Sequence, residues 1–538
     1  MIADKIFSWN KMPLLCVSLL AFVACTDKFE DYNTNQHEAT EEMMSHDNLK
    51  TGAFFSQLQR NVVLFKDGKN DDGSYQVSQG LTSDIYSGYI APTGTWYSGV
   101  HNGSYYFITG WIEKTFTSGF SSVMPAWQSI VEISEKQNLP EVSALATVVK
   151  VEAMHRVADA YGPIPYISFG SGSLQNNYDG LDQVYKKFFD ELDNAIDVLT
   201  VFIEGNPSAT LLSKYDLVYE GNVTKWVRFA NTLRLRLAMR VVYADPELAK
   251  TEAEKSISHP VGVISEVTDK ASLKHTSNLV YHHPLNEIAY KFNAGEARMG
   301  ASMDAYMNGY SDPRRAAYFK PAESDGKYHG VRLGITTSVW TPYVGVNISN
   351  LNVDESSTEI VWITAAESYF LRAEGALRGW TMGGTAQELY EKGIAISFEE
   401  NNLKGAETFI ADATSTPAAF ADNTGGSGLN APAPSAITIA WDASAAFERN
   451  LERIITQKWI AIYPDGPEGW AEFRRTGYPK LLPVVTNRSN GTVSTDLQVR
   501  RIPYPLTEYN NNSAGVQTGV AKLSGQDNGG TKLWWDKK

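Results

Sequence analysis

The sequence predicts an all-α protein, a scaffold of repeated helix pairs with long irregular insertions that carry short hairpins. Two observations lead to this prediction. Apolar residues recur at helical spacing in four paired segments, near residues 142–199, 222–257, 359–398 and 446–477. Long segments without a steady period separate them, near residues 89–111, 259–358 and 405–445. Stacked helix pairs bury one continuous core, so we expect residues 25–538 to form a single domain.

The first three pairs follow one design. They comprise Val142–Tyr161 with Leu181–Leu199, Asn222–Tyr243 with Asp245–Ile257, and Glu359–Trp380 with Thr385–Phe398. In the third pair, Ala386, Tyr390 and Gly393 have the spacing found in the second helix of a tetratricopeptide repeat. The small residues let two helices approach closely, and Tyr390 fills the gap between pairs. The predicted scaffold is therefore tetratricopeptide-like.

The last pair is bounded by prolines. Its first helix carries an apolar stripe at steps of three and four residues, formed by Phe447, Leu451, Ile454, Ile455, Trp459 and Ile462. Pro464 ends this helix, because proline lacks the N–H and restricts the residue before it. Pro467 can open a second, shorter helix, since proline is tolerated in a first turn. Neither helix can bury its apolar face alone, so another part of the chain must cover it.

Residues 1–24 have the pattern of a secretion signal peptide. Two lysines precede Met12–Ala24, an apolar run of 13 residues that is shorter than the roughly 20 needed to span a bilayer. The run leads into Cys25 in a way that resembles a bacterial lipobox, where cleavage leaves a lipidated N-terminal cysteine. The alternative is an ordinary signal peptide with an incidental cysteine. Since Cys16 lies inside the run, the mature protein has no disulfide framework, and we predict Cys25 as its lipidation site.

Composition and motifs argue against several functions. A formal charge of −14 without a basic stripe argues against nucleic-acid binding. Glu152 and His155 have the spacing of carboxylate-bridged metal sites, but no second such pair accompanies them. His282 and His283 are adjacent, so their rings diverge on a regular element. We predict no catalytic residue, no metal and no cofactor, although two carboxylates that meet only in the fold would leave glycoside hydrolysis open.

Aromatic residues in the insertions give binding a better physical case. A sugar has a polar rim and an apolar C–H face, which suits a flat ring flanked by amides and hydroxyls. Tyr and Trp provide such rings with little side-chain entropy to lose. We predict ligand contacts from two insertions, with the first contributing Trp96, Tyr97, Asn102 and Tyr105 and the second contributing Trp340 and Tyr343. The alternative is that these rings pack the insertions onto the scaffold.

Several motifs in one order resemble the SusD/RagB family of outer-membrane lipoproteins. They are Ala24-Cys25, Asp31–Asn35, Ala158–Tyr166, Asp312–Arg314, Glu452-Arg453 and Gly477–Pro479. The resemblance covers essentially the whole mature chain. It implies a helical fold on a tetratricopeptide-like scaffold, anchored to the outer membrane by its N-terminal lipid and facing outside. It also implies a SusC-like TonB-dependent transporter as partner and glycans as the usual ligands, with peptides in some branches.

These observations predict a non-enzymatic, lipid-anchored protein that binds glycan and delivers it to the transporter. Three alternatives stay open. The same scaffold could bind peptides, through a groove with charged side chains in place of an aromatic platform. The protein could be a lipid-anchored glycoside hydrolase, which would release products from a glycan. It could also be a protein-binding scaffold, the commonest use of tetratricopeptide-like repeats.

Overall fold

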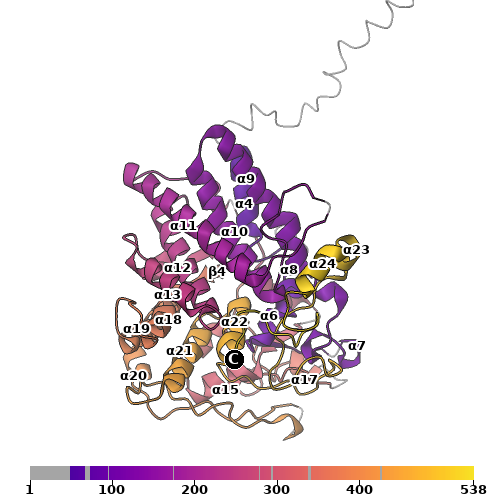
Figure 1. The fold of residues 1–538 in the computed structure, drawn as a ribbon. Helices are drawn as coiled ribbons and strands as arrows, with labels where there is room; N and C mark the ends of the chain where they lie inside the picture. The colour runs from indigo at the N-terminus through magenta and orange to yellow at the C-terminus, as the bar shows by residue number, and fades with distance from the viewer. Residues whose placement is uncertain are drawn as a thin grey trace, which may run out of the picture. The chain divides into compact units, whose positions relative to one another are not determined.

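Long α-helices form the scaffold of the protein in a computed structural model, as the sequence predicts (Figure 1). The structure describes residues 49–66, 73–94, 96–173, 175–277, 279–292, 295–336, 341–424 and 427–538. The predicted signal peptide and Cys25 lie outside these ranges. Within them, no helix is both long enough and apolar enough to cross a bilayer. The residues from Thr51 onward form one compact unit.

Three of the predicted helix pairs pack as pairs. α10 (Pro140–Tyr161) packs on α11 (Leu181–Gly205), α12 (Val223–Val241) on α13 (Pro246–Ser258), and α18 (Ala365–Leu377) on α19 (Ala386–Glu400). Asn222 and Thr385 cap α12 and α19, because their side-chain oxygens accept hydrogen bonds from the first turn of each helix. Since α11 also packs on α12, and α12 on α18, one apolar core runs through all three pairs.

The fourth pair is arranged differently. α21 (Phe447–Ala461) packs against α18, whereas α22 (Gly466–Thr476) packs against the short helix α6 (Ser83–Tyr86). The absence of a side chain at Gly466 allows the second contact, since a Cβ there would lie 2.0 Å from Asp84 Oδ1. The apolar face of this pair is therefore covered by two separate parts of the chain, and one of them immediately precedes the first insertion.

Shorter helices complete the unit. One helical run consists of α8 (Lys114–Ser118), the π-helical turn η6 (Gly119–Val123) and α9 (Met124–Gln137), which packs on α10. The other described helical segments are α4 (Leu49–Arg60), α5 (Gly73–Tyr75), η3 (Gln76–Gly80), α7 (Trp96–Gly99), η4 (Asn102–Ser104), η5 (Thr109–Trp111), η7 (Val267–Asp269), α14 (Pro284–Asn286), η8 (Glu287–Lys291), α15 (Ala301–Gly309), α16 (Arg315–Tyr318), α17 (Thr341–Val344), α20 (Ala406–Ile410), η10 (Ser427–Leu429), α23 (Leu506–Asn511) and α24 (Ser513–Val520).

Two small antiparallel sheets tie the insertions together. β1 (Ile90–Pro92) pairs with β3 (Ala297–Met299), and β2 (Ala271–Leu273) pairs with β4 (Ile360–Ile363). The strands are as short as those of the expected hairpins. Each strand pairs with a distant segment, however, and not with its neighbour in sequence. The first and second insertions are thus joined at their bases by main-chain hydrogen bonds.

Strand β4 also corrects the start of one predicted helix. The apolar pattern predicts a helix from Glu359 to Trp380, but the first part of this range is a β-strand. Its β-branched and aromatic residues pack well in a strand, and β2 offers them a partner. α18 begins only after Thr364, whose hydroxyl accepts a hydrogen bond from Glu367 N at 3.2 Å.

A buried ion network links the scaffold helices. At its centre, Arg236 of α12 lies 2.6 Å from Glu367 of α18, and neither side chain is more than 1 % exposed. Arg240, one turn further along α12, contacts Asp159 of α10 at 2.7 Å. The network consists of Glu152, His155, Arg156, Asp159, Arg236, Arg240, Glu367, Lys458, Asp465, Glu468 and Glu472. Charges buried this deeply are tolerated only when paired, so each helix depends on the position of its neighbours.

Glu152 and His155 belong to this network and not to a metal site. Glu152 pairs with Arg156 at 2.8 Å, and burial of this carboxyl is outweighed by Arg156 and Arg236, which lower the pKa of Glu152 to about 2. Burial opposes the charge of His155, but hydrogen bonds and charges from Asp159 and Glu152 raise the His155 pKa above its ordinary value. The i, i+3 spacing of Glu152 and His155 therefore places both side chains in the buried ion network.

Asp84 is a buried carboxyl at the contact between α6 and α22. It is 2 % exposed and accepts a 2.7 Å hydrogen bond from the Tyr75 hydroxyl, while its Oδ1 has no partner among the described residues. Burial raises the pKa of Asp84 to about 7, against the opposing effect of Tyr75. Because this value lies above the ordinary 3.8, the folded protein holds the proton more tightly than the unfolded chain. The free energy of unfolding therefore falls as the pH rises from about 4 to about 7.

We expect Asp84→Asn to remove this part of the pH dependence. The amide oxygen can still accept the Tyr75 hydrogen bond, but it cannot ionise. Urea unfolding at pH 5 and pH 8 should show that raising the pH favours the variant over the wild type by about 2.5 kcal/mol, since the window from pH 5 to pH 7 covers about two pH units of the shift. Asp182→Asn, at an exposed position, is the control. A difference between Asp84→Asn and wild type that is equal at both pH values would contradict the prediction.

Candidate functional site

The first insertion leaves the sheet and displays its aromatic residues on the surface. β1 ends at Pro92, and Thr93 N donates a 2.8 Å hydrogen bond to Glu296 O, which fixes the direction in which the chain continues. Beyond this point, residues 96–111 fold into three helical turns, α7, η4 and η5. We call residues 93–111 the aromatic segment. Its base is held by β3, so its tip has a fixed position on the scaffold.

Three rings of this segment form an aromatic cluster: Trp96, Tyr97 and Trp111. The Trp111 ring lies 6.0 Å from that of Trp96 and 5.8 Å from that of Tyr97, both edge to face. Tyr97 is 66 % exposed, and the two tryptophans are half-buried. Trp96 and Tyr97 therefore lie at the surface, as a ligand platform requires. Trp111 is not among the predicted contact residues, although this tryptophan ends the same aromatic stretch of sequence.

The backbone at the cluster is strained. Tyr97 and Ser98 have φ angles of 52° and 58°, in the left-handed region that non-glycine residues seldom adopt. Each such residue costs about 1–3 kcal/mol, and positions of this kind concentrate at functional sites. The strain turns the Tyr97 ring outward, where it buries little surface of its own protein. The ring contacts Trp111 edge to face and otherwise stays open to solvent, at 66 % exposure.

The buried ring of His101 packs against both tryptophans of the cluster. Its ring lies 5.5 Å from Trp96 and 6.3 Å from Trp111, and the residue is 2 % exposed. Its Nδ1 accepts a 3.1 Å hydrogen bond from Gly103 N. Burial lowers the pKa of His101 to about 4, so the ring is neutral at neutral pH. His101 thus holds two tryptophans in place without adding charge.

Asn102 and Tyr105 are buried, which corrects the prediction that they contact a ligand. The Asn102 amide donates to Leu81 O at 3.0 Å and accepts from Ile108 N at 3.0 Å, so it closes the loop on itself. The Tyr105 ring packs edge to face on Tyr86, at 6.2 Å. Both side chains are no more than 1 % exposed. They shape the aromatic segment and do not face the solvent.

The second insertion reaches the aromatic segment at Thr336. Tyr343 is 1 % exposed and packs with Ile335 and Ile348 in a small separate apolar cluster, so it supports the insertion and is corrected as a contact residue. Trp340 lies outside the described residues. Thr336 marks the approach, because a Cβ on Gly99 would lie 3.3 Å from its methyl group.

The third insertion is attached to the second. Asn423 donates a 3.0 Å hydrogen bond to Asn347 O, and Asp422 Oδ2 lies 3.4 Å from the Tyr343 hydroxyl. Arg332 donates to Leu429 O at 3.1 Å. The second insertion therefore contacts both the first, at Gly99 and Thr336, and the third, at Asn347 and Asn423.

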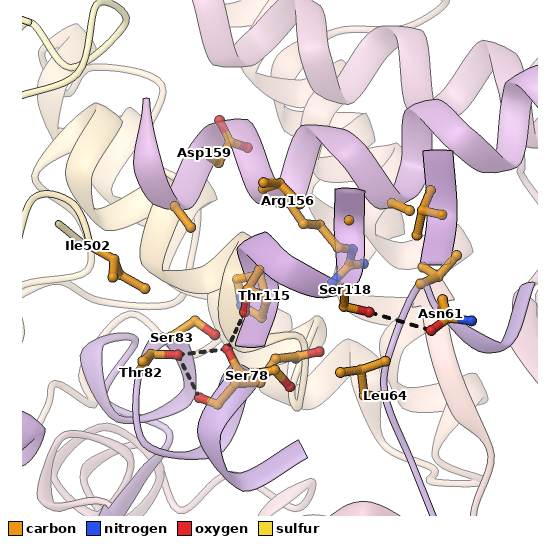
Figure 2. Close-up of a pocket in the computed structure, with 18 of the residues that line it drawn as sticks. Asn61, Leu64, Ser78, Thr82, Ser83, Thr115, Ser118, Arg156, Asp159 and Ile502 are labelled. Atoms are coloured by element: carbon orange, nitrogen blue, oxygen red, sulfur yellow. Dashed lines mark hydrogen bonds between the residues drawn. The ribbon is translucent and has the colours of Figure 1, made fainter. Parts of the chain in front are cut away.

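A cavity of about 50 Å³ lies between η3, α8 and α10 (Figure 2). Its walls include hydroxyls that already bond to protein atoms, such as those of Thr82 and Thr115, which both donate to Ser78 O. Arg474 also lines it, and its Nη2 has no partner among the described residues. The cavity is far smaller than the 300–1,000 Å³ of ligand pockets and suits ordered water.

One group of side chains has the residue types that ligate a metal ion. Among the described residues, His282, Glu287 and Glu355 lie close enough together to share an ion. The Lys291 ammonium already lies 2.6 Å from both carboxylates, and the side chains of His282 and Glu355 are half-buried. A lysine that satisfies both carboxylates makes this a surface ion-pair cluster.

Comparisons with known proteins agree with one another. The family model described as "Susd and RagB outer membrane lipoprotein" matches residues 31–536. A chitin-binding SusD homologue from Flavobacterium johnsoniae is 43% identical, with 91% of this chain and 99% of that chain covered and a TM-score of 0.86. SusD homologues from Bacteroides uniformis and Bacteroides vulgatus are 38% and 33% identical, with TM-scores of 0.85 and 0.86; they cover 91% and 93% of this chain and 100% and 99% of their own.

The comparison with curated proteins gave no match. The family model nevertheless spans nearly the entire described chain, and the solved homologues share its helical architecture over almost their full length. The motifs noted in the sequence are parts of that architecture. Arg314, for example, holds Asp312 at 2.6 Å and also donates to Gln457 of α21 at 2.7 Å. This chain belongs to the SusD-like family of outer-membrane lipoproteins.

Proposed function

We propose that this protein is a lipid-anchored, outward-facing receptor that binds glycan on the aromatic cluster and delivers it to a SusC-like TonB-dependent transporter. The exposed Tyr97 ring, held on a strained backbone beside Trp96 and Trp111, is the observation that carries the proposal. Family membership supports the location, and Cys25 is the residue we assign to the lipid. The apolar C–H face and polar rim of a sugar match aromatic rings at a surface, which supports glycan as the ligand class.

The geometry suits a saccharide for two physical reasons. Rings set edge to face present two surfaces at an angle, so adjacent sugar units of a twisted chain can each pack a C–H face against a ring. The supporting residues His101, Asn102 and Tyr105 are buried and hydrogen-bonded, so little conformational freedom remains to be lost on binding. The mechanism is stacking and hydrogen bonding, without covalent chemistry.

Chitin-derived oligosaccharides are the first ligands to test. The homologue from Flavobacterium johnsoniae is described as chitin-binding and is 43% identical to this chain. The acetamido group of each N-acetylglucosamine adds a methyl group that can pack on an aromatic ring and an amide that can hydrogen-bond. Starch-like and cellulose-like oligosaccharides test the alternatives within the same class.

We expect Tyr97→Ala and Trp111→Ala each to weaken glycan binding by about tenfold or more. Each substitution removes a ring whose packing on a sugar contributes about 1.4 kcal/mol or more, which corresponds to a factor of ten. Affinity electrophoresis of the mature protein in gels containing a panel of polysaccharides measures the loss. Trp96→Ala and Trp340→Ala extend the test to the other predicted platform residues. Trp380→Ala, at a half-buried tryptophan in the segment after α18, is the matched control.

Other outcomes would support the alternatives. Retardation by a glycan that survives all four platform substitutions would retain the function and refute the site. An absence of retardation by every glycan, with binding of a peptide library, would favour the peptide-binding alternative. Release of reducing sugar from a retained glycan would favour a hydrolase. Co-purification of the protein with a TonB-dependent transporter after mild solubilisation of the outer membrane tests the partner.

A further inference from the structure

A second pocket lies among the scaffold helices, away from the aromatic cluster. It has a volume of about 380 Å³, within the range of small-molecule sites, and is formed by α9, α10, the segment after α10, and α11. Figure 1 shows α9 and α11 toward the top of the view and α7, with the aromatic cluster, at the lower right. The two sites therefore share no residue and no helix.

Aromatic side chains form one wall of this pocket. Trp127 of α9 is half-buried, and its indole N–H is occupied by a 3.0 Å hydrogen bond to Thr147, which fixes the orientation of the ring. Phe169 is half-buried, and Ile167 beside it is 47 % exposed. An apolar surface open to solvent at this place gains free energy when a ligand covers it.

Lys150 forms the floor of the pocket. Its side chain is 1 % exposed, and its ammonium lies 3.7 Å from the centre of the Trp127 ring and 2.8 Å from Glu191. The Tyr166 hydroxyl donates to the other oxygen of the same carboxylate at 2.5 Å. Burying an ammonium in this way costs free energy that one carboxylate and two rings offset only in part. Burial lowers the pKa of Lys150 to about 8, against the opposing charge of Glu191, so it is charged at neutral pH.

The polar rim of the pocket completes the pattern. Asp190 and Asn194 of α11 are exposed at its edge, one turn apart on the same helix as Glu191. A carboxylate accepts, an ammonium donates, and an amide does both. Side by side, these groups match the alternating donors and acceptors of neighbouring sugar hydroxyls, while the aromatic wall matches the C–H face of the ring.

We propose that this pocket is a second saccharide-binding site, in which a single sugar unit packs against Trp127 and Phe169 and its hydroxyls bond to Lys150, Glu191 and Asn194. The volume admits one or two sugar units and not an extended chain.

The test reads each site through its own tryptophan. The mature protein is labelled with 5-fluorotryptophan and titrated with four probes: chitohexaose, cellohexaose, maltohexaose and xylohexaose. The fluorine resonances of Trp127, Trp96 and Trp111 are assigned by single substitutions to phenylalanine, and that of Trp380 serves as an internal control. We expect at least one probe to shift the Trp127 resonance. Phe169→Ala should weaken that response at least fivefold while leaving the responses of Trp96 and Trp111 unchanged.

The outcomes separate this proposal from the function proposed above. A shift of Trp96 and Trp111 with no shift of Trp127, for any probe, would overturn the second site and leave the first intact. A shift of Trp127 alone would support the second site and count against the aromatic cluster. A Trp127 shift that disappears in the Trp96→Ala/Tyr97→Ala protein, or persists unchanged in Phe169→Ala, would show that Trp127 reports a distant event, and would also overturn the second site.

Discussion

Replacing Arg236 with methionine should lower the free energy of unfolding by about 3–5 kcal/mol. Arg236 donates to both oxygens of Glu367, at 2.8 and 2.6 Å, and to Trp362 O at 2.8 Å, with no exposure of its side chain. Methionine fills much of the same volume but leaves the buried Glu367 with only Lys458, at 3.5 Å, as a counter-ion. Urea unfolding followed by circular dichroism measures the loss as a lower midpoint.

Two further variants separate charge from packing. Arg228→Met changes the same helix, where the arginine is 35 % exposed and pairs with the buried Asp269 at 2.9 Å, and should cost less than Arg236→Met because water can reach Asp269 in place of the guanidinium. Adding Glu367→Gln to Arg236→Met should recover part of the loss, because it removes a buried charge that has lost its nearer counter-ion. Equal losses for Arg228→Met and Arg236→Met would contradict the view that the buried network holds the helices in place.

Trp459→Ala should have an effect of similar size, about 3–5 kcal/mol, through the loss of packing. The indole is fully buried in α21, stacks on Tyr89 at 5.3 Å between ring centres, and contacts Tyr306 at 5.4 Å. Its N–H donates to Ser87 O at 2.8 Å, so the same side chain also anchors the residues that lead into β1. Thermal and urea unfolding both measure the loss.

Matched substitutions make the Trp459 prediction specific. Trp459→Phe keeps most of the apolar volume and should lose clearly less stability than Trp459→Ala. Trp380→Ala removes a half-buried tryptophan from the segment after α18 and should lose less than either. A Trp459→Ala protein within about 1 kcal/mol of wild type would show that the core closes around the missing ring, contrary to our expectation.

The helical scaffold was predictable because its signals are local. The apolar stripe of α21 and the capping residues Asn222 and Thr385 act within a few positions, and the structure follows them closely. Strand β4 was not predictable in the same way. Ile360–Ile363 is apolar in a manner that fits either a helix or a strand, and only its distant partner β2 decides between them.

Distant partners also decide which single residues of the candidate site are buried. Aromatic residues in a Gly- and Ser-rich segment mark a surface loop, and Trp96 and Tyr97 do lie at the surface. Composition does not tell which members of the segment point inward. Asn102 points inward because its amide hydrogen-bonds to Leu81 O and Ile108 N. Tyr105 points inward because its ring packs on the Tyr86 ring. These partners are set by the fold and not by the neighbouring sequence.

The pairing of β1 with β3 has a consequence for how such proteins diverge. Main-chain hydrogen bonds are indifferent to side-chain identity, so Ile90–Pro92 and Ala297–Met299 can keep the bases of two insertions together whatever residues follow them. The loops beyond this junction can then change in length and chemistry without disturbing the scaffold. The two three-residue strands mark a natural boundary for exchanging residues 93–111 between homologues, so that a new sugar preference can be acquired on an unchanged framework.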